Sequence, residues 1–354
     1  MLSDIRVTPS PHISYTLSTR RIMADVIIGL LFPLAAAGYY YRWYALTLTA
    51  TCVITCLITE LLCNIIRRIP RPASSLGDLS AVVTGMILAF SLPPAFPLWA
   101  AAIGSAFAIA IGKMVFGGLG SNIFNPAMAG RIFLTASFGI MMTTWTVPAT
   151  IDPSMPLIGQ TSPRIESMAC YYEKQAIIAR TQATPLAQSK EALKNKTGAK
   201  DLNGQMKAAF FGEVGGCLGE TSALALLVGG AYLLLRKTIS YHIPLAVIAS
   251  AFIFGAIAWL INPDAYMSPV MHILTGGLLI GAFFIATDPV TAPLTKTGML
   301  IFGAGVGAIT MLVRIIGEYP EGVMYSVLLM NAVSPLIDRM IKPKPAGGVP
   351  NAKS

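Results

Sequence analysis

Charged residues are scarce in this chain. Asp, Glu, Lys and Arg make up only 12% of its 354 residues, hydrophobic residues make up 55%, and the mean hydropathy is +0.67. A soluble domain carries about 25% charged residues. The deficit excludes an ordinary soluble protein and predicts an integral membrane protein.

Metal-ligating side chains are also few. The chain has three His and five Cys, and the Cys spacing matches no metal-binding pattern. Cys52, Cys56 and Cys63 share one apolar run, where Cys most often packs as a small apolar residue. Cys52 and Cys56 are one helical turn apart, which leaves a metal site as the less favoured alternative. We expect no metal site and assign no catalytic residue.

Two further signals are missing. The first 19 residues are polar and include Pro9 and Pro11, without the short apolar core of a cleavable signal. We therefore expect the first apolar helix to remain as a membrane anchor. No Gly-rich nucleotide-binding fingerprint follows a strand pattern, so the chain is not expected to bind a dinucleotide itself.

Long apolar runs dominate instead. A full helical crossing needs about 20 residues, and we expect ten helices, in the segments 22–41, 43–66, 79–93, 95–112, 121–142, 222–235, 243–261, 270–287, 297–316 and 323–341. The third is short and ends in Pro93-Pro94, and the eighth ends against Asp288-Pro289. Interrupted spans in corresponding places of two halves indicate a binding site at their interface.

Basic residues predict the orientation. Clusters such as Arg67-Arg68 and Arg236-Lys237 fall between apolar segments on one side, which the positive-inside rule assigns to the cytoplasm. Both termini are then cytoplasmic and the long central loop is external. The net charge of +9 follows from these flanks meeting anionic lipid, so we expect a lipid bilayer and no nucleic acid as partner. The expected division is a cytoplasmic N-terminal segment (1–21), a first membrane repeat (22–145), an external loop (146–220), a second membrane repeat (221–341) and a cytoplasmic tail (342–354).

The two halves echo each other in sequence. Thr84-Gly85 and Thr275-Gly276 each lie in an apolar run that leads to a proline-marked break, and Asn125-Pro126 has a weaker counterpart at Asn331. Five spans per half is an odd number, so the second copy must enter the membrane inverted. The alternative is coincidence, because Thr-Gly pairs are common in apolar helices.

Several polar residues fall where lipid is expected. Glu60 lies deep in the second apolar segment, as an interior hydrogen-bond partner or as a coupling residue. Asn122, Asn125 and Arg131 belong to a Gly-rich, broken entry into the fifth segment, which favours a cavity lining. Thr287 and Asp288 lie in a proline-broken run that can meet a ligand, the alternative being a turn capped by Asp288.

The segment Gly215–Ala223 joins the long polar loop to an apolar helix. It resembles the flavin-attachment motif of the NqrB/RnfD family, whose usual form is Asp-Gly-x-Ser-Gly-Ala-Thr and whose threonine carries FMN. Gly216, Gly219 and Thr221 keep that pattern. The alternative is a glycine-shaped loop in which Thr221 or Ser222 caps the next helix.

The resemblance to the NqrB/RnfD family extends over the whole chain. Its matching segments are 10–12, 78–85, 121–131, 219–223, 286–293 and 318–326. The chain lacks the long N-terminal extension of the Nqr members, so it is more similar to the D subunits of Rnf complexes. The resemblance implies ten transmembrane helices in two inverted five-helix repeats, as in urea transporters.

The family also implies a function. Rnf complexes of the prokaryotic plasma membrane pass electrons between reduced ferredoxin and NAD and couple this to Na⁺ or H⁺ transport. Ferredoxin and NAD are then expected on other subunits, with this chain inactive alone. The alternatives are a urea-transporter-type channel for a small polar solute and a purely structural scaffold.

The family finally implies the cofactors. FMN is expected in a phosphoester bond to Thr221, and riboflavin nearer the cytoplasm. The expected cofactor-binding residues are Thr221, Gly219, Glu220, Ser222, Asn122, Asn125, Arg131, Thr287 and Asp288.

Overall fold

The computed structural model describes residues 18–145, 184–195, 204–317 and 319–342, and these contain helices and no strand. Four helices are long and apolar enough to cross a membrane: α1 (Thr19–Tyr41), α2 (Trp43–Ile66), α11 (His242–Ile261) and α14 (Lys296–Ile315). A fifth span is formed if the 3-10 helix η1 (Pro72–Asp78) and α3 (Ser80–Phe90) count together, although a 60° bend separates them. The bend falls at Leu79, whose φ of 65° is left-handed and ends η1. The prediction of an all-helical membrane protein is confirmed.

Shorter helices complete the bundle. They are α4 (Leu98–Ile109) with the π-helical turn η2 (Ala110–Met114), α5 (Pro126–Ser137), α6 (Gly139–Met142), α10 (Ala223–Leu235), α12 (Pro269–Leu274), α13 (Leu278–Ile280) with the π-helical turn η5 (Gly281–Ile285), and α15 (Val323–Met340). Each of the ten expected apolar segments therefore contains a helix. Three further helices precede α10: α8 (Pro185–Asn195), α9 (Met206–Phe211) and the 3-10 turn η4 (Leu218–Glu220).

Local sequence explains where several helices begin. Asn125 caps α5 by accepting a hydrogen bond from the backbone N–H of Met128, and Pro126 occupies the first turn. Ser268 and Thr295 cap α12 and α14 in the same way.

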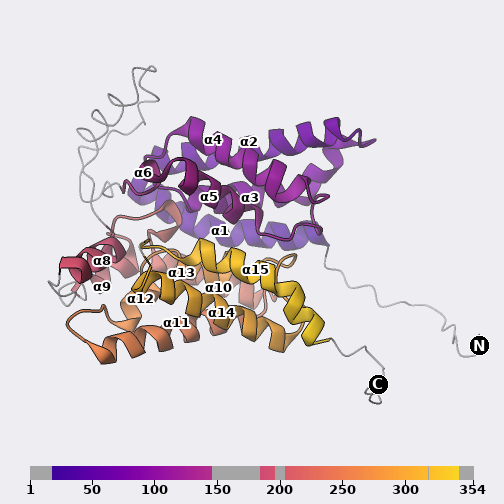
Figure 1. Cartoon of the computed structure of the whole chain (residues 1–354). Helices are drawn as coiled ribbons and strands as arrows, with labels where there is room; N and C mark the ends of the chain where they lie inside the picture. Colours follow the sequence, from indigo (N-terminus) through magenta and orange to yellow (C-terminus); the bar gives the residue numbers. More distant parts are fainter. Residues whose placement is uncertain (1–17, 146–183, 196–203, 318, 343–354) are drawn as a thin grey trace, which may run out of the picture.

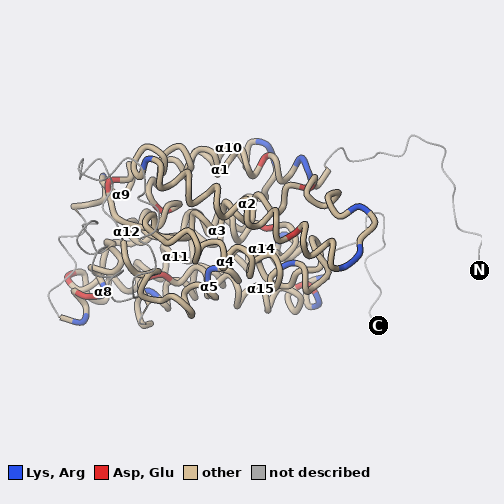
Figure 2. Tube along the Cα trace, turned by 90° about the horizontal axis from the view of Figure 1, so that it is seen from above, with Lys and Arg blue, Asp and Glu red and all other residues tan. Residues whose placement is uncertain are grey.

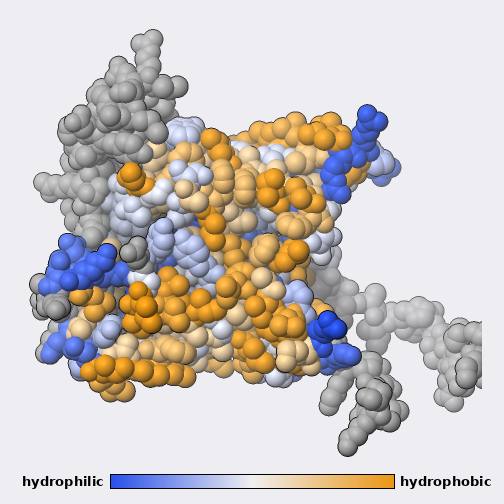
Figure 3. Space-filling view, viewed as in Figure 1, coloured by the Kyte–Doolittle hydropathy of each residue, from blue (hydrophilic) through white to orange (hydrophobic). Residues whose placement is uncertain are grey.

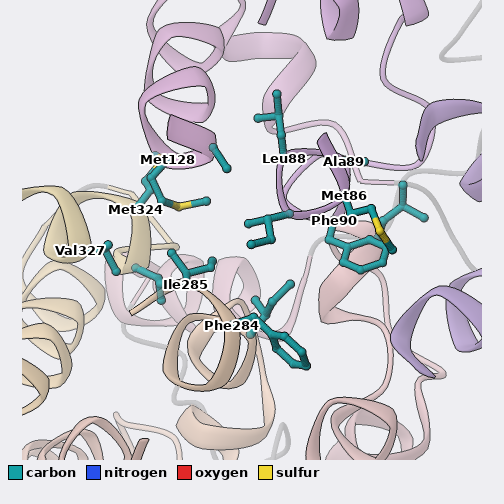
Figure 4. Close-up of a cluster of buried hydrophobic side chains, with 14 of the residues drawn as sticks. Met86, Leu88, Ala89, Phe90, Met128, Phe284, Ile285, Met324 and Val327 are labelled. Atoms are coloured by element: carbon teal, nitrogen blue, oxygen red, sulfur yellow. The ribbon is translucent and has the colours of Figure 1, made fainter. Parts of the chain in front are cut away.

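The elements are arranged in two layers (Figure 1). Helices α2 to α6 form one layer, and α11 to α15 form the other, with α1 packed on α10 between them and α5 against α15. Buried apolar side chains of α3, α5, η5 and α15 meet where the layers join (Figure 4), among them Phe90, Met128, Phe284 and Met324. The core thus lies between the two halves of the sequence.

The surface matches a bilayer. Apolar side chains cover the middle of the visible face and hydrophilic ones gather at its two ends (Figure 3). Most charged residues likewise lie toward the ends of the bundle (Figure 2). Helix α1 begins and α15 ends at one end, whereas α8 and α9 lie at the opposite end (Figure 1).

The Thr-Gly echo differs between the halves. Thr84-Gly85 lies within α3, where a Cβ on Gly85 would approach the Val53 backbone of α2 within 2.7 Å. Thr275-Gly276 instead forms the break between α12 and α13, and Gly276 has a φ of 71°. The two pairs therefore differ in backbone conformation: the first is helical and the second is unwound.

Some expectations fall outside the described residues. They are residues 1–17 of the N-terminal segment with the 10–12 match, residues 146–183 and 196–203 of the loop, Glu318, and residues 343–354 of the tail.

Candidate functional site

The structure divides the expected cofactor-binding residues between two places. Thr221, Gly219, Glu220, Ser222 and Arg131 lie near the end of the bundle that carries α8 and α9, which we call the loop end. Asn122, Asn125, Thr287 and Asp288 line a cavity near the start of α1, which we call the terminal end. The distance between the two places can be estimated along helix α1, because α1 reaches both of them. Met23 lines the cavity, and the Tyr40 hydroxyl donates to the Phe211 carbonyl beside Ser222. At 1.5 Å per residue these ends are about 25 Å apart.

Thr221 is buried at the loop end. Its side chain is 1% exposed, and its hydroxyl donates to the Leu218 carbonyl at 2.6 Å. Ser222 caps α10, since its Oγ accepts from the Ala225 N–H at 3.3 Å. The cap alternative is thus what the structure shows for Ser222. For Thr221, any attachment would require this hydroxyl to leave its partner.

Gly219 permits a close approach. A Cβ on Gly219 would lie 2.6 Å from Cβ of Phe90 in α3. The glycine of the motif therefore lets η4 pack on α3, and this contact brings Glu220 over the layer interface.

Glu220 faces Arg131 across that interface. Oε1 of Glu220 lies 3.9 Å from Arg131 Nη2, and the same guanidinium nitrogen donates to Sγ of Cys217 at 3.7 Å. Burial raises the pKa of Glu220 to about 7, and the nearby Glu321 carboxylate contributes. The raised pKa lowers the negative charge of this carboxyl, and with it part of the repulsion that a flavin phosphate would meet here.

A second charged pair lies next to the first. Arg314 of α14 contacts Glu321 at 3.4 Å and donates to the carbonyls of His272 at 2.5 Å and Thr275 at 3.1 Å. Glu321 also accepts from the Gly277 N–H at 2.8 Å, so the pair holds the α12–α13 break in place.

The sequence analysis did not single out Arg314, Glu321 or His272. Arg314 is a lone charged residue among apolar residues at the end of a span. An intramembrane charge of this kind indicates a functional residue. Glu321 lies within a matched family segment, and His272 has no such signal.

Unpartnered polar atoms concentrate at the loop end. Among the described residues, seven buried side-chain atoms lack a hydrogen bond, and all but one belong to residues of this region: Tyr41 Oη, Arg131 Nε, Glu220 Oε1, Arg314 Nε and both ring nitrogens of His272. Buried polar groups are normally satisfied, so such a cluster indicates a site for a polar ligand.

A second threonine lies near this cluster. Thr184 precedes α8 and caps it, with Oγ1 accepting from the Ala187 N–H at 3.1 Å. Its neighbour Leu186 packs with Met267 and Met271, so α8 is docked on the second half of the chain. The dipeptide Ala183-Thr184 matches the Ala-Thr pair that ends the family motif, and the sequence analysis did not use this signal.

The cavity at the terminal end lies where both halves meet. Its volume is about 60 Å³, and its polar lining includes Ser80, Lys113, Asn122, Asn125 and Asp288. Asp288 accepts from the Val290 N–H at 3.3 Å and from the Thr291 hydroxyl at 3.1 Å, so it both caps a turn and lines the cavity.

Two asparagine side chains contribute to the polar lining of this cavity. Asn125 Nδ2 donates to the Ile285 carbonyl of η5 at 3.5 Å, and Asn122 Nδ2 donates to the Phe124 carbonyl at 3.1 Å. Asn122 Oδ1 is the seventh buried atom without a partner in the described part of the chain. Thr287 is already engaged, donating to the Phe283 carbonyl at 2.7 Å.

Fold and sites together define a class of protein: an all-helical integral membrane protein with one polar site at each end of the interface between two layers. The chain belongs to the NQR2, RnfD, RnfE family, whose pattern matches residues 6–347.

Relatives match over nearly their whole length. The D subunit of the Na⁺-translocating ferredoxin:NAD⁺ oxidoreductase complex of Acetobacterium woodii is 41% identical over 340 residues, which cover 96% of this chain and 94% of the relative. The D subunit of the ion-translocating oxidoreductase complex of Cronobacter sakazakii is 37% identical, with 97% and 99% covered. Its counterpart from Shewanella frigidimarina is 37% identical, with 97% and 98% covered. The sequence-based family resemblance is confirmed.

Proposed function

We propose that this chain is the flavin-carrying membrane subunit of an Rnf-type ferredoxin:NAD oxidoreductase complex that couples electron transfer to Na⁺ or H⁺ transport. The observation that carries this is the whole-length match to the D subunits of such complexes. We assign ferredoxin and NAD to other subunits, as the family resemblance implies. The relatives do not support the alternative of a urea-transporter-type channel.

We propose ten membrane crossings in two inverted five-helix repeats. Each half supplies two helices, an interrupted span and two more helices, in the same order. Corresponding elements meet across the interface, α1 with α10 and α5 with α15. A two-fold relation between the halves would produce these like-with-like contacts, and it supports the urea-transporter-like arrangement.

The proposed orientation places the terminal end in the cytoplasm of a prokaryotic cell and the loop end outside. The basic pairs Arg67-Arg68 and Arg236-Lys237 support this, because Arg236 bonds Asp25 near the start of α1. The cavity then opens toward the cytoplasm and the α8–α9 region lies outside.

We propose that FMN is bound covalently by a threonine at the loop end. The sequence motif predicts Thr221, and its proximity to Arg131 and the unpartnered atoms supports that residue. Its buried, engaged hydroxyl weighs against it. Thr184 is the second candidate. It is also buried, at 6% exposed, but toward the described residues its hydroxyl oxygen accepts one hydrogen bond, from the Ala187 N–H, and donates none. The geometry favours Thr184.

Riboflavin is the proposed ligand of the cavity at the terminal end. The free Oδ1 of Asn122 and the amide of Asn125 can hydrogen-bond a planar polar ring, while Phe284 and Ile87 supply apolar walls. When bound, the two flavins would supply the one-electron chemistry that amino-acid side chains lack. The chain itself positions them at opposite ends of the interface.

Flavin fluorescence of the denatured polypeptide tests the covalent attachment. We expect a fluorescent band for the wild-type chain and for Ser222→Ala. Loss of the band in Thr184→Ala, with Thr221→Ala still fluorescent, would assign the bond to Thr184, and the reverse would assign it to Thr221. A wild-type chain without fluorescence would refute covalent FMN.

A further inference from the structure

An ion pair is buried inside the first half of the chain. The ammonium Nζ of Lys113 lies 2.8 Å from Oε2 of Glu60, and the two side chains are 2% and 1% exposed. Glu60 sits deep in α2, one of the apolar spans. Charges held at such depth are costly and are functional by default. The sequence left open whether Glu60 is only a hydrogen-bond partner, and its partner proves to be a charge.

Lys113 also faces the cavity at the terminal end. It lies in η2, and π-helical turns of this kind occur frequently at functional sites. The second π-helical turn, η5, contributes Phe284 to the same cavity. An ammonium group has three donors, and Lys113 uses one on Glu60 and one on Ser80 Oγ at 2.6 Å. Among the described residues Lys113 donates to these two partners and to no third.

Side-chain oxygen atoms extend from the Glu60–Lys113 pair toward the terminal end of the bundle. Ser80 Oγ donates to Oδ1 of Asp78 at 2.6 Å, and Asp78 is partly exposed at the end of η1. Glu60, Ser80 and Asp78 thus form a row of oxygen atoms with Lys113 in its middle. Carboxylate and hydroxyl oxygens are the ligands that hard cations prefer.

We propose that Lys113 is the cation that binds negative charge in the cavity, and that Glu60 is a cation-exchange site that Lys113 occupies until then. Negative charge in the cavity draws the ammonium toward it. Glu60 then takes one monovalent cation, Na⁺ or a proton, that enters past Asp78 and Ser80. This inference rests on the proposed function, in which reduction of the bound flavin by the complex adds one negative charge per electron. Each electron is then balanced by one cation.

The alternative is a purely structural ion pair. A structural pair would stay closed whatever the cavity holds, and removing either partner would only destabilise the protein. The two cases differ in cation uptake upon reduction.

The first experiment uses the purified complex, reduced anaerobically with dithionite. Flavin bleaching is followed by absorbance, proton uptake by a pH-indicator dye, and ²²Na⁺ retention on a desalting column. We expect Glu60→Gln to take up one cation fewer per reduced cavity flavin than wild type. Glu191→Gln is the matched control, because Glu191 is an exposed glutamate on α8. The dye and the isotope identify the cation as a proton or Na⁺.

Normal bleaching with unchanged uptake in Glu60→Gln would overturn the exchange site alone. Absence of any flavin bleaching in wild type would instead overturn the proposed function.

A second experiment needs no flavin. In Lys113→Met the Glu60 carboxylate loses its tethered partner, so we expect the unfolding temperature of the complex to rise with added NaCl or with acidification, relative to wild type. Adding Glu60→Gln to Lys113→Met should abolish that dependence. Equal salt and pH dependence in the single and the double variant would overturn a cation site at Glu60.

Discussion

At the residue scale, the structure is governed by buried charges that are paired across helices. Glu60 with Lys113, Arg131 with Glu220, and Arg314 with Glu321 are all largely removed from solvent. The first pair is close and well bonded, whereas Arg131 and Glu220 lie 3.9 Å apart without a hydrogen bond. The loose pair lies at the loop end, where we propose that FMN binds.

Glu220 should make stability depend on pH. Its pKa is about 7 in the folded protein against 4.5 for the ordinary group, chiefly because of burial. The folded state then binds more protons than the unfolded state between these values, so stability falls as the pH rises from about 4.5 to about 7. We expect Glu220→Gln to flatten the unfolding temperature across this window. An unchanged slope in this variant would show that Glu220 does not titrate there.

At the scale of elements, close helix contacts depend on small residues. Gly85 of α3 lies against the α2 backbone, and a Cβ there would come within 2.7 Å of Val53 Cα. Overpacking of this kind costs about 1–3 kcal/mol. We therefore expect Gly85→Ala to lower the unfolding temperature, whereas Gly38→Ala in α1, with nothing within 4 Å of its added Cβ, should not. Equal effects of both changes would contradict the tight contact.

Lys190 holds helix α8 against the C-terminal end of α14. Lys190 Nζ donates to the carbonyls of Val313 at 3.1 Å and Gly317 at 2.5 Å, and to that of Tyr319, so it caps the end of α14. The macrodipole favours a cation at this position. Because Thr184 caps the start of α8, this contact also positions the threonine that the geometry favours for FMN.

Replacing Lys190 should loosen α8. We expect Lys190→Met to speed amide hydrogen exchange in α8 while the membrane helices stay protected, and Lys194→Met, at an exposed position of the same helix, to leave it unchanged. Unaltered exchange in Lys190→Met would mean that the apolar contacts of Leu186 suffice to hold α8.

At the scale of the whole molecule, the orientation in the membrane is the main prediction. A membrane-impermeant thiol reagent should label Asn195→Cys in intact cells and Arg68→Cys only after lysis, above the background labelling of the unsubstituted protein. Both substituted positions are exposed, whereas Ser189 of α8 is only 5% exposed and would be a poor reporter. Labelling of Arg68→Cys in intact cells would reverse the topology.

The sequence by itself determined the class, the helical segments, the family and four residues of the terminal cavity, Asn122, Asn125, Thr287 and Asp288. These follow from local signals: apolar runs of membrane length, prolines and glycines that interrupt them, and asparagines next to those breaks. Such signals act within a few residues, so they can be recognised from the sequence without knowledge of the fold. Asn125 and Asp288 were recognised in this way, although they come from different halves.

Only the tertiary structure decided which charges meet and which hydroxyls are free. Lys113 and Glu60 are 53 residues apart, and nothing local couples them. The burial of Thr221 depends on η4 packing against α3, and the docking of α8 depends on carbonyls of α14. Pairings of this kind arise when packed helices exclude water together, and helix packing sets which side chains then face one another.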